Sequence, residues 1–142
     1  MENNNLDILD EINKGATMGM DAISYVSEKV GDETFSKVLD GEYNNISRRV
    51  NNLYSNYSDK EPHETNAMNK MMTWYGIQMN TITDKSNSKI SELLMQGTNM
   101  GIIEGRRLLN QNQENIATDV KNILNDFVVM QEDSVETLKK YL

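Results

Sequence analysis

Apolar residues recur at spacings of three and four along most of the chain, which is the period of helices packed along one face. Before the break at Gly31 and Asp32, this pattern predicts a helix at about 5–30. Asp32 is a good N-cap for a second helix at about 32–57. Because a two-residue joint connects helices of similar length, we expect an antiparallel hairpin.

The second half of the chain predicts a shorter helix followed by another hairpin. A loop at 58–66 holds the single proline, Pro62. Apolar spacing then predicts helices at about 67–85, 88–109 and 114–141, separated by polar breaks. Ser88 is a candidate cap for the second of these helices.

The long connection between the two hairpins suggests a particular topology. A helix of about 18 residues rises roughly 27 Å, so segment 67–85 is long enough to carry the chain back along a bundle. The helices at 32–57 and 88–109 then run in the same direction. We therefore expect an all-α, single-domain chain (1–142) that folds as a ferritin-like four-helix bundle (up-down-down-up) with an additional helix in the crossover. The alternative is a simple up-and-down array of five helices.

Glycines interrupt the predicted core faces in a repeated pattern. The motif G-x-x-M-G occurs at 15–19 and again at 97–101, and Gly105 continues the second series. Each helical glycine costs about 1 kcal/mol relative to alanine, so a compensating contact is expected. We interpret Gly15, Gly19, Gly97, Gly101 and Gly105 as sites of close helix packing; the alternative is space for a ligand. The repeat fits either a duplicated hairpin or a chance match between heptads.

The predicted helix at 67–85 is apolar over a wide arc. Its large apolar residues are Met68, Met71, Met72, Trp74, Tyr75, Ile77, Met79 and Ile82. One neighbouring surface would not cover them all, and small monomers rarely expose such a patch. We therefore expect a homodimer, or a complex with another protein, with Met71, Met72, Trp74 and Tyr75 as interface candidates. The alternative is that this helix lies deeper in the bundle.

Composition and charge exclude several classes of function. The chain has no cysteine and a formal net charge of −8, with no concentrated basic stripe. Thiol chemistry is thus excluded, and nucleic acid or an anionic membrane is not an expected partner. The sequence shows neither a signal-peptide pattern nor an apolar run long enough to span a bilayer. We expect a cytoplasmic protein.

A di-iron site of the ferritin-like type needs a glutamate from each of two helices and Glu-x-x-His from each of the other two. No Glu-x-x-His occurs, and the single histidine, His63, lies in the proline-containing loop. Glu42 and Glu104 fall near inward faces, and Arg49 is the expected ion-pair partner of Glu42. These three residues are the candidates for an inward polar site, either an ion pair or a remnant metal site. We expect no cofactor and no catalytic residues, which favours a protein without enzymatic activity.

Several segments carry a family resemblance. They are Glu11 to Val30 followed by Asp32-Glu33-x-Phe35, then Met71-Met72-x-Trp74, then Asp84-Lys85-Ser86 leading to Glu92-Leu93-Leu94-Met95-Gln96-Gly97. They resemble uncharacterised small proteins of clostridia and related Firmicutes, similar to the DUF2383-type, rubrerythrin-related branch of the ferritin-like superfamily. This resemblance implies the ferritin-like bundle, but the metal-ligand positions of rubrerythrins have no matching residues here.

Two functions follow as hypotheses. The first is a non-catalytic helical module that binds a partner or a second copy of itself. The second is a divergent metal- or small-ligand-binding protein related to rubrerythrin and ferritin. The small number of inward carboxylates favours the first.

Overall fold

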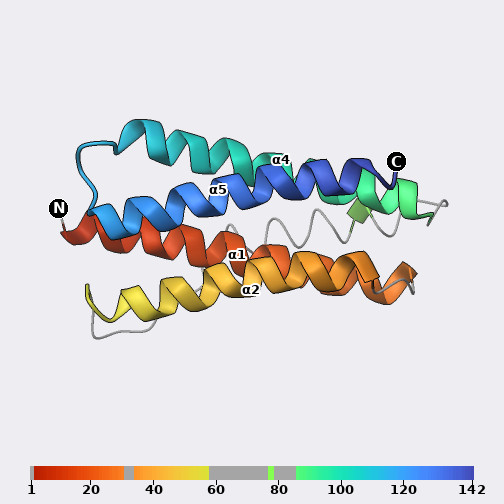
Figure 1. Cartoon of the computed structure of the whole chain (residues 1–142), viewed down its shortest axis with the longest axis horizontal. Coiled ribbons are helices and arrows are strands. Elements are labelled where there is room, and N and C mark those ends of the chain that lie inside the picture. The colour runs from red at the N-terminus through yellow and green to blue at the C-terminus, as the bar shows by residue number, and fades with distance from the viewer. Residues whose placement is uncertain (1, 31–33, 58–76, 79–85) are drawn as a thin grey trace.

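The computed structural model describes residues 2–30, 34–57, 77–78 and 86–142. This part of the chain forms four long helices packed as a bundle: α1 (Glu2–Val30), α2 (Thr34–Tyr54), α4 (Asn87–Gln111) and α5 (Thr118–Lys139) (Figure 1). The all-α class and the four long helices expected from the sequence are thus confirmed. The expected helix at 67–85, apart from 77–78, lies outside the described residues.

All four helices start within a few residues of the expected positions, and hydrogen bonds explain the starts of α4 and α5. Helix α4 is capped by Ser86 rather than Ser88, because the Ser86 hydroxyl accepts a hydrogen bond from the Lys89 N–H at 3.3 Å. Helix α5 starts at Thr118, several residues later than the apolar period suggests. The preceding residue, Ala117, has extended backbone, and its N–H donates to Asn5 of α1 at 2.8 Å. This tertiary contact holds the chain out of the helix at that point.

Helices α2 and α5 pack side by side and run antiparallel. Three polar contacts join them at roughly heptad spacing: Tyr57 with Asp119, Arg49 with Asp126, and Glu42 with Ser134. The residue numbers fall along α2 as they rise along α5, which requires opposite directions. We call this row of contacts the α2/α5 polar seam.

Helices α1 and α5 run parallel, and this fixes the relative directions of all four helices. Asn5 contacts Ala117, and the Phe127 ring lies against Gly15, so residue numbers rise together on both helices. Since α1 is antiparallel to α2, and α4 to α5, helices α2 and α4 point the same way (Figure 1). The end of α2 and the start of α4 therefore lie at opposite ends of the bundle.

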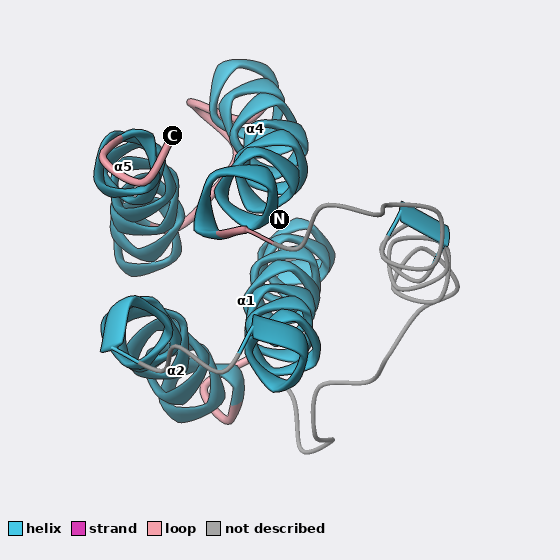
Figure 2. Cartoon of the chain, turned by 90° about the vertical axis from the view of Figure 1, so that its right-hand side faces the viewer, coloured by secondary structure: helices cyan, strands magenta, loops and turns pink. Residues whose placement is uncertain are grey.

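Seen end-on, the four helices stand at the corners of a square, with α1 beside α2 and α4, and α5 beside α4 and α2 (Figure 2). All four contribute to one continuous hydrophobic core. Its fully buried large side chains include Ile8, Leu9, Ile12, Val50, Ile90, Leu93, Val120, Leu124, Val128 and Leu138. Where side chains are described, each helix buries most of the apolar stripe that its sequence period indicated, although Met100 of α4 is 38 % exposed. This burial is the main source of stability in such a bundle.

Candidate functional site

Glycines of α1 and α4 make room for large side chains from neighbouring helices. A Cβ atom on Gly19 would collide with the ring of Tyr43, and one on Gly15 would press on the ring of Phe127. The corresponding positions on α4 behave alike: a Cβ on Gly101 would meet the Gln131 amide, and one on Gly105 would meet Val128. These glycines thus admit side chains from α2 and α5, a form of close packing that single-helix patterns do not specify.

The side chains admitted by these glycines bring a polar group into the middle of the core. Tyr43 is 4 % exposed and Gln131 is 3 % exposed. Thr98 of α4 and Ser134 of α5 are also buried beside them. Burial raises the pKa of the Tyr43 hydroxyl, although hydrogen bonds with the side chains of Thr98 and Gln131 act in the opposite direction. Tyr43 therefore stays neutral at physiological pH and can both donate and accept hydrogen bonds.

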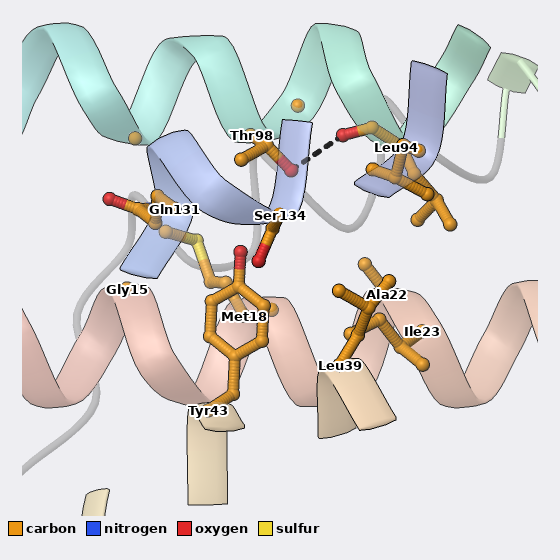
Figure 3. A pocket seen from close by; sticks show the side chains of 14 residues that line it. Gly15, Met18, Ala22, Ile23, Leu39, Tyr43, Leu94, Thr98, Gln131 and Ser134 are labelled. Carbon is orange, nitrogen blue, oxygen red and sulfur yellow. Dashed lines mark hydrogen bonds between the residues drawn. The ribbon is translucent and has the colours of Figure 1, made fainter. Parts of the chain in front are cut away.

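A small cavity lies next to these groups, with a volume of about 50 Å³. We call it the central cavity; its walls include Gly19, Tyr43, Thr98, Gln131 and Ser134, together with apolar side chains of all four helices. Figure 3 shows Tyr43 projecting from α2 with its hydroxyl directed toward α4 and α5, and Thr98 bonded to the carbonyl of Leu94. Cavities enclosed by facing helices are the usual place for ligands in helical bundles.

The candidates for an inward polar site are not gathered at this cavity. Glu104 is exposed and pairs with Arg107 on its own helix. The expected inward position of Glu104 is therefore corrected: its neighbour Gly105 is the buried one, and one residue rotates a helical side chain by about 100°. Arg49 pairs with Asp126 at 2.8 Å, so its ion-pair partner is on α5 rather than Glu42 on its own helix.

Glu42 lies at the edge of the cluster rather than inside it. Its side chain is exposed, and it accepts a hydrogen bond of 3.4 Å from the Ser134 hydroxyl. Partial burial raises the pKa of the Glu42 carboxyl, and the nearby Asp133 acts in the same direction. Glu42 therefore brings negative charge near one edge of the central cavity without entering it.

The donor set of the bundle centre does not fit a di-iron site. Hydroxyls and one amide occupy it, whereas such a site takes carboxylates and histidines. Among the described residues, no group of three or more histidine, cysteine, aspartate and glutamate side chains could hold a metal ion. In the same part of the chain, no helix combines the length and apolarity needed to cross a membrane.

A second hollow lies on the surface, between α1 and α4. We call it the α1/α4 groove; it has a volume of about 450 Å³ and is lined mainly by apolar side chains. Ile103, 56 % exposed, and Met100, 38 % exposed, stand at this groove. Charged side chains of both signs flank it, among them Glu11, Lys14 and Glu104.

Some residues of the site were not predicted from the sequence, and some predicted residues cannot be placed in it. Gln131 and Thr98 were not among the expected site residues, although Gln131 follows Phe127 at the helical spacing of four and could have been found by it. The interface candidates Met71, Met72, Trp74 and Tyr75 lie outside the described residues.

No protein-family model, no curated protein and no solved structure matches the chain significantly. The fold and its central cavity define the class as a small all-α protein with four helices packed as a bundle. The resemblance to the rubrerythrin-related branch rests on the sequence pattern alone.

Proposed function

We propose that this chain is a non-catalytic, ferritin-like helical module without a di-iron site, which associates with a second copy of itself. The helix directions support the ferritin-like assignment, since α2 and α4 point the same way and a long connection must join opposite ends of the bundle. The neutral donor set at the bundle centre supports a role other than metal-dependent redox chemistry.

The observation that carries the proposed association is the α1/α4 groove. It exposes Ile103 and Met100 beside an apolar hollow, an arrangement typical of surfaces that bind another protein. A second copy is the best occupant because both helices carry paired charges of opposite sign: Lys14 pairs with Glu11 on α1, and Arg107 with Glu104 on α4. Two-fold pairing can then match opposite charges at the rim despite the net charge of −8.

Sedimentation velocity at micromolar concentration tests this proposal. The purified protein is expected to sediment as a dimer. Ile103→Glu would place a charge in the apolar groove and is expected to give a monomer. Val129→Glu is the matched control, because Val129 is also exposed (41 %) but lies on α5, toward α2. A monomeric wild-type protein would contradict the association.

The variants also locate the interface. If Ile103→Glu leaves the dimer intact while Trp74→Glu dissociates it, the interface lies in segment 67–85, as the sequence suggested, and the groove is not the contact surface. The alternative function, a divergent metal-binding protein, is tested by elemental analysis of protein purified without a histidine tag. Stoichiometric iron, manganese or zinc would replace the present proposal with that one.

A further inference from the structure

An unpartnered oxygen on a residue that lines the central cavity points to a ligand. The Oε1 atom of Gln131 is buried, with less than 1 Å² exposed, and has no hydrogen-bond partner among the described residues. A molecule in the cavity therefore reaches this oxygen when the flexible end of the side chain turns toward the cavity. A 180° flip of the amide would put the nitrogen in the place of the oxygen and leave the nitrogen without a partner instead. Such a flip therefore does not satisfy the buried position. A buried polar atom without a partner costs about 1–3 kcal/mol. Native cores normally avoid this cost by hydrogen-bonding such atoms to protein groups or to bound molecules.

The walls of the cavity restrict what that ligand is. Its volume of about 50 Å³ accommodates roughly three to five waters at about 10–15 Å³ each, or one molecule of a few non-hydrogen atoms. The polar wall carries the neutral groups of Tyr43, Thr98, Gln131 and Ser134, which offer both donors and acceptors. The remaining wall is apolar, with Ala22, Leu39 and Leu94 among its members.

Charged and purely apolar ligands fit these walls poorly. A buried ion needs a counter-charge or metal ligands, and the polar side chains that line the cavity are all neutral. An anion would also meet the negative charge of Glu42, which contacts Ser134 at the edge of the cluster. An apolar gas or hydrocarbon would leave Gln131 Oε1 unsatisfied.

We propose that the central cavity is a binding site for a small neutral molecule that both donates and accepts hydrogen bonds, with the Gln131 amide and the Tyr43 hydroxyl as its principal contacts. Two sources supply this chemistry: solvent water, and small neutral solutes such as amides or alcohols of up to about four non-hydrogen atoms. The cavity and the α1/α4 groove share Gly15, Met18 and Gly101 in their walls, so occupancy of the cavity is to be measured both in the wild-type protein and in Ile103→Glu.

Magnetization transfer between water and the protein in nuclear magnetic resonance tests the site directly. In the wild-type protein, transfer from long-lived water to the Gln131 side-chain NH₂ is expected. Titration with formamide separates the two sources. A saturable shift of the Gln131 NH₂ signals with loss of water transfer assigns the site to a small solute. Retained water transfer without a shift assigns it to water. If neither water transfer nor a formamide shift is found at Gln131, the proposal is overturned.

Variants and xenon check that the polar wall holds the ligand. Gln131→Met replaces the amide by an apolar side chain of similar length and is expected to abolish water transfer to the Tyr43 and Thr98 region. Gln113→Met is the matched control, since Gln113 is exposed in the connection before α5. Xenon is expected to shift the Leu39 and Leu94 methyl signals in Gln131→Met but not in wild type. Xenon binding in wild type, without water transfer, shows a dry cavity and overturns the proposal; this measurement does not depend on the variant folding.

Discussion

In each of the two hairpins, α1/α2 and α4/α5, a glycine of the first helix leaves room for a large side chain of the second, but the side chains differ. In the first, Gly19 of α1 admits the ring of Tyr43 from α2. In the second, Gly101 of α4 admits the amide of Gln131 from α5. The glycines occupy the same place in the repeated G-x-x-M-G motif, and both admitted side chains point into the bundle centre.

The two side chains differ in their flexibility and in whether all their polar atoms have hydrogen-bond partners. The Tyr43 ring is rigid, and it packs edge-on against Phe127 with ring centroids 6.2 Å apart. Gln131 ends in a flexible side chain whose oxygen lacks a partner among the described residues. The first hairpin therefore contributes a rigid ring that carries its hydroxyl to the central cavity, and the second contributes a flexible amide beside the same cavity.

The largest effect is expected at Gly19. In Gly19→Ala the added Cβ meets a ring that cannot move aside, so overpacking at roughly 1–3 kcal/mol should outweigh a helix-propensity gain of about 1 kcal/mol. In Gly101→Ala the added Cβ meets the far end of Gln131, which can turn away, so little net change is expected. Urea denaturation measures both free energies of unfolding.

Gly41→Ala provides the control for helix propensity, because nothing lies within 4 Å of the added Cβ on exposed Gly41. It is expected to stabilise the protein by about 0.5–1 kcal/mol. Equal destabilisation by the Gly19 and Gly101 substitutions would show that the two hairpins do not differ in the way described.

A smaller loss of stability is expected from removing a hydrogen bond that joins the two hairpins. Asn5 of α1 is 4 % exposed and accepts the Ala117 N–H at the start of α5. In Asn5→Ala that N–H loses its partner, which should lower the free energy of unfolding by about 1–2 kcal/mol. Asn44→Ala, at an exposed position in α2, should leave stability nearly unchanged or slightly raised. Thermal unfolding followed by circular dichroism compares the two; similar melting temperatures would mean that Asn5 does not hold the hairpins together.

The smallest effect concerns pH and the α2/α5 polar seam. The hydroxyl of Tyr57 donates to Asp119 at 2.7 Å, and this hydrogen bond raises the pKa of Tyr57 to about 12 from an ordinary 10.0. Because the folded-state pKa is the higher one, the contribution to stability is fully present below about pH 10 and is lost as pH rises toward 12. Ultraviolet titration of wild type minus Tyr57→Phe should show one phenol titrating near this value.

Asp119→Asn tests whether the carboxylate charge is what raises the pKa of Tyr57. It keeps an acceptor near Tyr57 but removes the charge, so the pKa of Tyr57 is expected to move back toward its ordinary value. A Tyr57 titration that is identical in wild type and Asp119→Asn would show that the carboxylate is not responsible.

The sequence by itself determined the helical class, the approximate extent of four helices and most of the core. These follow from apolar spacing along each helix, since a stripe such as Leu39, Tyr43, Ile46 and Val50 has to be buried somewhere. It also indicated that glycines at 15, 19, 101 and 105 meet close neighbours. Periodicity could not identify those neighbours, because it states which residues share a face and not which helix lies opposite.

The tertiary structure decided the pairings and therefore the candidate site. Arg49 pairs across to Asp126 because α5 lies beside α2, and Glu104 points outward because Gly105 takes the buried position. Gln131 is a polar residue on a mostly apolar stripe. It becomes part of the candidate site only because the fold places Gly101 and Tyr43, from two other helices, against it. Burial between α2, α4 and its own helix makes its amide oxygen costly to leave unpaired, and no pattern along one helix contains that information.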